Sequence, residues 1–146
     1  MGGDAPALEA AIRDFYWRLR RAMDRLLASS GSSVVRTKLL LWILKNGPLR
    51  SGEISEAFDY SPRTTTEAID ALERDGLVLR DQDPADRRAK LVSITSEGTA
   101  LLARSEPAMR QYMDDVFTAL AADEQQKLAE LLEKLSARLD ALERQR

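Results

Sequence analysis

The sequence predicts a mainly α-helical protein with one small β-hairpin. Apolar residues recur every three or four positions over long stretches at both ends of the 146-residue chain, which is the spacing of amphipathic helices. Between these stretches, two short β-prone segments flank a polar loop. Hydrophobic residues make up 44% of the chain and charged residues 32%, a balance typical of helix-rich folded proteins rather than disordered ones.

Two helices are expected in the first third of the chain. The first, from about Ala7 to Ala28, has one apolar stripe, formed by Leu8, Ile12, Phe15, Leu19, Met23 and Leu26. A serine-rich loop follows. The second helix, from about Val35 to Lys45, is apolar on most sides, which indicates a buried helix. Gly47 and Pro48 should end it.

A short third helix, about Ser51 to Phe58, leads through a turn into a fourth helix. Ser61 is a good N-cap, and Pro62 suits the first helical position because proline has no amide proton to lose there. The fourth helix should end near Arg74, since Gly76 is a typical C-terminal stop. Two helices joined in this way are expected to form a helix-turn-helix.

Two strands are predicted next, from Leu77 to Arg80 and from Lys90 to Ile94, joined by a long hairpin loop over residues 81–89. A helix-turn-helix followed by such a hairpin has the order of a winged helix-turn-helix. Thr95 is a good N-cap for a fifth helix, in which Pro107 predicts a kink.

A sixth helix is expected after Asp123. Its leucines alternate by four and three residues and form a seam consisting of Leu128, Leu132, Leu135, Leu139 and Leu142. Such a seam packs against another helix, either within the chain or in a second copy of it. A terminal amphipathic helix beside a DNA-reading module is well placed to make a dimer, and a dimer matches two-fold symmetric DNA sites.

The residue types that the chain lacks exclude several kinds of metal site and catalytic site. The chain contains no cysteine and no histidine. A thiolate zinc site, a disulfide framework and catalysis by Ser-His-Asp or Cys-His groups are therefore excluded. We expect no cofactor, no metal ion and no enzymatic activity. No apolar run reaches the ~20 residues that a membrane helix needs, and the first residues do not resemble a secretory signal, so we expect a cytoplasmic protein without a membrane partner.

Basic residues are unevenly distributed along the sequence. The net charge is −2 and the isoelectric point about 5.3, which by itself argues mildly against a nucleic-acid partner. Between Arg13 and Lys38, however, seven basic residues are opposed by only two acidic ones. Part of the surface can therefore be positive on an acidic protein. Arg36, in this segment, is a candidate DNA contact.

The first half of the fourth helix carries polar side chains suited to DNA. Arg63 can reach a guanine or a phosphate. The hydroxyls of Ser61, Thr64 and Thr66 suit phosphates and base edges. Consecutive threonines are poor helix formers because β-branched side chains lose rotamer freedom, which favours a functional reason for them. Glu67 lies on the same face, where its carboxylate could accept from cytosine. The alternative interpretation is an ordinary solvated helix surface.

The expected hairpin loop carries Asp86, Arg87 and Arg88, with Lys90 following. An arginine at such a tip can enter a narrow minor groove of DNA, where the electrostatic potential is most negative. Asp86 is expected to orient a neighbouring arginine rather than to bind a metal ion. The alternative is a charged turn exposed to solvent.

The whole pattern resembles the MarR family of bacterial transcription regulators over nearly the full length of the chain. The most specific segment is DPADRRAKLVSITSEG, in which the matching residues are Asp83, Pro84, Asp86, Arg88, Val92, Ile94, Thr95 and Gly98. The segments GPLRSGEISEAF and ALERDGLV fit the flanks of the family's helix-turn-helix. The resemblance implies a homodimer on a palindromic operator, with the fourth helix in the major groove and Arg88 in the minor groove.

The resemblance also implies which segments of the chain dimerise and which segment binds DNA. It predicts an N-terminal dimerisation helix (1–34), a winged helix-turn-helix (35–98) and C-terminal dimerisation helices (99–146), all in one compact chain. In many members a small, often aromatic ligand binds between the dimer and DNA lobes and weakens DNA binding. Tyr16, Trp17 and Trp42 are candidates for such a pocket, although core packing is the alternative for each. Glu67 departs from the family pattern, because several relatives carry a basic residue there.

The sequence thus predicts a DNA-binding transcriptional regulator, with a repressor released by a small ligand as the leading hypothesis. The alternative is a protein-interaction module on the same fold with weak or lost DNA binding. The acidic isoelectric point and Glu67 favour this alternative, whereas Arg63 and the basic residues of the hairpin oppose it.

Overall fold

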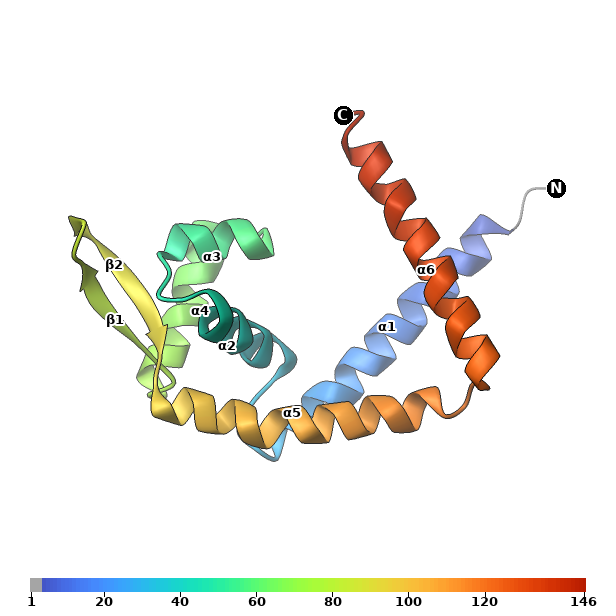
Figure 1. The fold of residues 1–146 in the computed structure, drawn as a ribbon, viewed down its shortest axis with the longest axis horizontal. Helices are drawn as coiled ribbons and strands as arrows, with labels where there is room; N and C mark the ends of the chain where they lie inside the picture. Colours follow the sequence, from blue (N-terminus) through green and yellow to red (C-terminus); the bar gives the residue numbers. More distant parts are fainter. Residues whose placement is uncertain (1–3) are drawn as a thin grey trace. The chain divides into compact units, whose positions relative to one another are not determined.

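The computed structural model describes residues 4–146, and the chain divides into two compact units at Met109. The first unit contains α1 (Ala5–Ala28), α2 (Val34–Asn46), α3 (Ser51–Phe58), α4 (Pro62–Arg74), β1 (Val78–Asp83), β2 (Asp86–Ile94) and the first part of α5 (Ser96–Phe117). The second contains the end of α5 and α6 (Ala122–Glu143). The predicted mainly α fold with a two-stranded wing is confirmed (Figure 1).

The helix-turn-helix begins and ends as its sequence predicts. The Ser61 hydroxyl accepts the Thr64 amide at 3.1 Å, and Pro62 is the first residue of α4. Gly76 has a φ of +75°, a left-handed conformation that glycine adopts without steric cost, and the helix stops just before it. Asp59 makes the turn between α3 and α4 with a φ of 52°. Local capping rules therefore suffice to set the two ends of α4.

The hairpin differs from its prediction. The two antiparallel strands pair from Val78 opposite Ile94 as far as Asp83 opposite Asp86, so the expected loop over residues 81–89 is almost entirely strand. Only two residues form the turn. The polar sequence was misleading because this ribbon stands away from the core, and an antiparallel pair can expose its side chains to water and still keep its backbone hydrogen bonds.

A third segment, which was not predicted from the sequence, pairs with the base of this wing. Leu49, just before α3, exchanges two backbone hydrogen bonds with Val92 on β2, at 3.0 and 2.7 Å. The wing is thereby attached to the helix-turn-helix by the main chain. α5 starts after Thr95, whose hydroxyl accepts the Gly98 amide at 3.1 Å, and continues as a helix through Pro107.

The core of the first unit lies between α2, α3, α4, the base of the wing and the start of α5. It consists of Leu39, Leu40, Ile43, Leu49, Ile54, Ile69, Leu72, Leu77, Val78, Val92, Leu101 and Leu102. α2 is buried on one face only, contrary to the prediction, because Leu44 is 48% exposed and Trp42 38%. None of the described helices is long and apolar enough to cross a membrane.

Candidate nucleic-acid interface

The exposed face of α4 presents the predicted DNA-contacting side chains. Arg63 has 88% of its side chain exposed, and its Nε donates to Glu67 Oε1 at 2.9 Å. Because the carboxylate occupies Nε, the two Nη groups remain available for a bidentate contact such as that to guanine. An exposed ion pair between residues four apart on a helix is weak, so a contact between Arg63 and DNA would replace it at little cost.

The three threonines of α4 divide into two kinds. Thr64 and Thr66 are exposed, with the Thr64 hydroxyl 2.8 Å from that of Ser61 and the Thr66 hydroxyl donating to the Pro62 carbonyl at 2.9 Å. Thr65 is buried and accepts from the Ser55 hydroxyl at 2.7 Å, which links α4 to α3. One threonine of the run is therefore explained by packing, and two remain available on the face that is a candidate for DNA.

The basic side chains of the wing lie on β2, directly after the turn. Arg87, Arg88 and Lys90 are all exposed. Asp86 Oδ1 accepts the backbone amide of Arg88 at 3.0 Å, and the Gln82 amide donates to the Arg87 carbonyl at 3.0 Å. Asp86 therefore contacts the backbone of Arg88 and not its guanidinium. The Arg88 side chain can still change rotamer.

An ion pair that was not predicted from the sequence connects the start of α3 to the wing. Arg50, at the N-cap of α3, donates to the nearly buried Asp83 at the end of β1. The Ala85 backbone amide and the Arg50 guanidinium hold the pKa of Asp83 below its ordinary value, and the carboxylate in turn raises the pKa of Arg50. An arginine just before a helix gave no local signal of this partner, which lies 33 residues away.

Arg36 has a partner of its own within the chain. Its guanidinium pairs with Asp75 at the end of α4, and this hydrogen bond lowers the pKa of the Asp75 carboxyl. About a quarter of the Arg36 side chain, 27%, is exposed. A contact between Arg36 and DNA stays a prediction, and it would require the guanidinium to serve Asp75 and a phosphate together.

Arg80, on the wing, pairs with two further acidic residues of α4. Arg80 on β1 is 16% exposed in its side chain and donates to Asp70 at 2.6 Å and to Glu73 at 3.0 Å. Together with the Arg36–Asp75 pair, these contacts neutralise acidic side chains in the C-terminal half of α4. The N-terminal half of the helix keeps its exposed Arg63.

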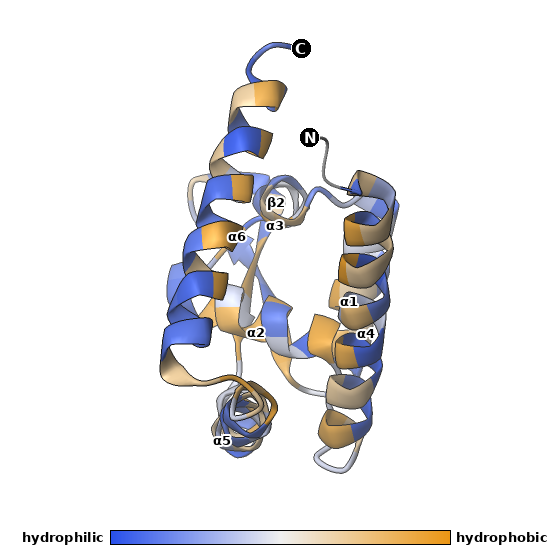
Figure 2. Ribbon diagram, turned by 90° about the vertical axis from the view of Figure 1, so that its right-hand side faces the viewer, coloured by the Kyte–Doolittle hydropathy of each residue, from blue (hydrophilic) through white to orange (hydrophobic). Residues whose placement is uncertain are grey.

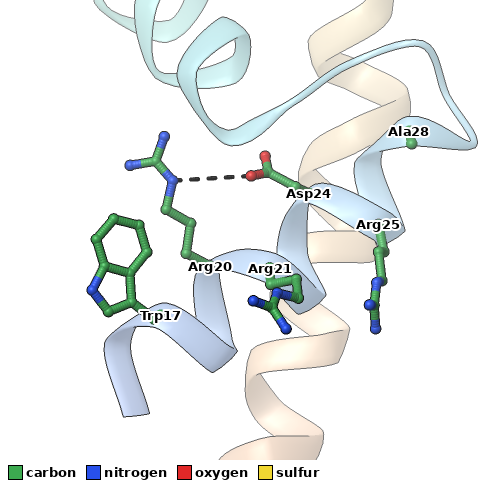
Figure 3. A pocket seen from close by; sticks show the side chains of 6 residues that line it. All are labelled: Trp17, Arg20, Arg21, Asp24, Arg25 and Ala28. Carbon is green, nitrogen blue, oxygen red and sulfur yellow. Dashed lines mark ion pairs between the residues drawn. The ribbon is translucent and has the colours of Figure 1, made fainter. Parts of the chain in front are cut away.

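Of the three aromatic residues predicted for a ligand pocket, Trp17 lines the open pocket described below, and Tyr16 and Trp42 are not among its lining residues. Trp42 packs edge-on against Phe58, with ring centroids 5.8 Å apart, whereas Tyr16 and Trp17 contact each other on α1. An open pocket of about 530 Å³ is lined by Trp17, Arg20, Arg21, Asp24, Arg25 and Ala28 (Figure 3). These arginines were not predicted as pocket residues from the sequence.

Arg20 is the most constrained cation of this pocket. Its Nη1 donates to the Tyr16 hydroxyl at 3.3 Å and its Nε lies 3.9 Å from Asp24 Oδ2, contacts that raise its pKa. In Figure 3, Trp17 and Arg20 stand near each other, and Arg21 and Arg25 point to the other side of α1. An aromatic ring with an anionic group would match the indole and guanidinium that this arrangement offers.

The leucine seam of α6 is exposed over its whole length. The exposed fractions of its residues are 37% for Leu128, 50% for Leu132, 53% for Leu135, 61% for Leu139 and 42% for Leu142. Apolar positions recur along one edge of α6 in Figure 2. α1 likewise exposes more than half of the surface of Leu8, Ile12, Phe15 and Trp17. Such exposed apolar faces are candidate surfaces for packing against another helix.

These features define the chain as a winged helix-turn-helix DNA-binding protein, and three comparisons place it within that class. Residues 33–90 match the model of the MarR family. The chain is 33% identical over 125 residues to the HTH-type transcriptional regulator PrsX of Escherichia coli, covering 84% of this chain and 75% of PrsX. It is 31% identical over 135 residues to the HTH-type transcriptional repressor IacR of Pseudomonas putida, covering 88% and 80% of the two chains.

A solved structure shares the fold. Sco3205, a MarR-family transcriptional regulator of Streptomyces coelicolor crystallised in complex with DNA, superposes with a TM-score of 0.79 at 23% identity, covering 95% of this chain and 93% of that one. The match to the family model and the likeness to PrsX show that the chain belongs to the MarR family. It is a DNA-binding transcriptional regulator and not an enzyme.

Proposed function

We propose that the protein is a homodimeric, sequence-specific repressor that reads DNA with the N-terminal half of α4 and with the basic residues of the wing. The observation that carries this proposal is the exposed Arg63, whose Nη groups are left free by Glu67, together with a wing that presents Arg87 and Arg88 directly after its turn. An arginine fork suits guanine in the major groove, and an arginine in the wing suits a narrow minor groove.

The experiment is a comparison of variants on DNA selected from a random pool by the purified full chain. Arg63→Ala should weaken binding by about 1–3 kcal/mol and relax the preference at one base pair, because it removes a base contact. Arg87→Ala should weaken binding to all sequences equally and lower the salt slope by about one, because it removes a phosphate contact. Arg88→Ala should be most harmful on duplexes with A/T-rich minor grooves at the wing position.

A matched control is Arg104→Ala, which removes an exposed arginine from α5. The result that would refute the assignment of the wing is equal DNA affinity for the wild-type protein and the Arg87→Ala/Arg88→Ala double variant. Binding that depends on salt but on none of these arginines would instead favour the protein-interaction module, with only non-specific affinity for DNA.

The proposal of a dimer rests on the exposed apolar faces of α1 and α6. Each helix on its own leaves a stripe of large apolar side chains in water, which folded monomers rarely do over contiguous areas. A second copy of the chain would cover both faces with two-fold symmetry. Two winged helix-turn-helix units related by this symmetry would fit a palindromic operator. Gel filtration of the complex with a palindromic and a half-site duplex would test this match.

Repression and its release are the remaining part of the proposal. The relative IacR is named a repressor, and the pocket beside Trp17 offers an aromatic side chain and arginines to a small aromatic anion. In a Trp42→Phe variant, Trp17 is the only tryptophan left and reports on its pocket by fluorescence. An aromatic carboxylate that quenches this signal and weakens DNA binding in the same concentration range would support the proposal. Unchanged DNA affinity at saturating quenching would refute it.

A further inference from the structure

The side chain of Arg50 connects the start of α3 with the turn of the wing. Its Nε and Nη2 donate to the same oxygen of Asp83, at 2.9 and 2.5 Å, and its Nη1 lies 4.0 Å from Asp86 Oδ2. The other oxygen of Asp83 accepts the Ala85 amide at 2.9 Å. One carboxylate, 7% exposed, thus takes three hydrogen bonds at the point where β1 ends.

The main chain of Arg50 is also fixed. Its amide donates to Glu53 Oε2 at 2.8 Å in the first turn of α3. The preceding residue, Leu49, is paired with Val92 at the base of the wing. Arg50 therefore extends from a rigid position on the helix-turn-helix, and its side chain reaches the far end of the hairpin.

Between base and tip, the wing has little packing of its own. Apart from Asp83, the residues of β1 and β2 beyond the base are exposed or only half-buried. An isolated two-stranded ribbon is marginally stable in water, and its direction is easily changed. The contact between Arg50 and Asp83 is consequently the interaction that holds the tip in place relative to α3 and α4.

We propose that Arg50 is a positioning residue for DNA recognition, which sets where Arg87 and Arg88 stand relative to α4 by binding Asp83. This proposal rests on the proposed DNA contacts of these two arginines. Because Asp83 already pairs with the charge of Arg50, the role proposed for Arg50 is exercised through the wing rather than through a phosphate contact.

Asp83→Asn tests the proposal by the sign of its effect. This substitution removes a negative charge from a DNA-binding surface, so electrostatics alone predicts tighter binding, most of all at low salt. Positioning predicts the opposite. Affinity should fall about five- to tenfold, the size expected for the loss of a half-exposed, charge-assisted contact. Tighter or unchanged binding of Asp83→Asn would overturn the proposal.

Arg50→Gln separates positioning from a direct phosphate contact. We expect a similar five- to tenfold loss at about constant salt slope, whereas a lost phosphate contact would lower the slope by about one. Arg50→Lys keeps the charge but not the fork of donors, and should recover part of the affinity. Arg104→Gln, which removes an exposed arginine from α5, is the matched control and should leave binding unchanged. Thermal melting confirms that each variant is folded.

A double-mutant cycle links the effect to the wing. In an Arg87→Ala/Arg88→Ala background, Arg50→Gln should cause no further loss, because the side chains that it positions are gone. Additive losses would overturn the proposal. If the Arg87→Ala/Arg88→Ala variant binds as well as the wild-type protein, the proposed DNA contacts of the wing fail as well. If that variant binds weakly while Asp83→Asn does not, only the positioning role of Arg50 fails.

Discussion

Replacing Leu135 by aspartate should convert the proposed dimer to a monomer. In the isolated chain 53% of Leu135 is exposed, so about half of its surface remains to be buried by a partner. Complete burial of a leucine contributes about 1.5–3 kcal/mol, so this half is worth about 0.8–1.5 kcal/mol in each copy. A two-fold interface counts it twice, about 1.6–3 kcal/mol, and each 1.4 kcal/mol is a factor of about ten in Kd.

The aspartate adds a further penalty to this lost burial. Two carboxylates placed in an apolar seam must be desolvated without a partner, or must take up protons. The combined effect should raise the dimer Kd by well over about a hundredfold. Sedimentation equilibrium at micromolar concentration measures it directly, and we expect a dimer for the wild-type chain and a monomer for Leu135→Asp.

Ala137→Asp is the matched control for this experiment. Ala137 lies two residues further along α6, outside the leucine seam, and is exposed. The same aspartate at this position should therefore leave the dimer intact. A wild-type monomer at micromolar concentration, or equal dimerisation of Leu135→Asp and Ala137→Asp, would refute the reasoning that the seam is the subunit interface.

Three further predictions concern stability, specificity and pH. Gly98→Ala should destabilise the fold by about 1–3 kcal/mol in denaturant unfolding, because its Cβ would lie 2.2 Å from the Leu77 carbonyl oxygen; unchanged stability would show that the start of α5 can shift. Glu67→Gln should change the preferred bases if Glu67 accepts from cytosine, and should tighten binding to every sequence if it only repels phosphates; no change at any salt concentration would mean that Glu67 is merely solvated. The pKa of Asp83 is lower in the folded chain than the ~3.9 of an unfolded aspartate, so its stabilisation is present above about pH 4 and is lost as the pH falls through the folded pKa. Thermal melting between about pH 5 and pH 3 should show this loss, and Asp83→Asn should flatten the profile.

Some features of the molecule were predictable because they depend on neighbours in the sequence. Ser61 and Pro62 start α4 and Gly76 ends it through contacts with the adjacent turn, and these contacts follow from residue type alone. The period of the leucines in α6 likewise places them on one face. The candidate DNA-contacting residues of α4 were identified in the same way, from an N-cap and the side chains that follow it.

Tertiary structure alone decided the partners of the arginines. Arg36 and Arg50 pair with carboxylates that lie 39 and 33 residues away in the sequence. Which carboxylates they meet depends on how the chain folds back on itself. The length of the wing strands was decided in the same way, because polar residues form strand when a paired backbone offers hydrogen bonds. Thr65 is buried because α4 packs on α3 at this position. The sequence by itself thus determined the helices, the N-caps of α4 and α5 and the apolar seam, since these are short-range properties. The ion pairs that hold the wing and the reading helix together are long-range, and only the folded chain selects them.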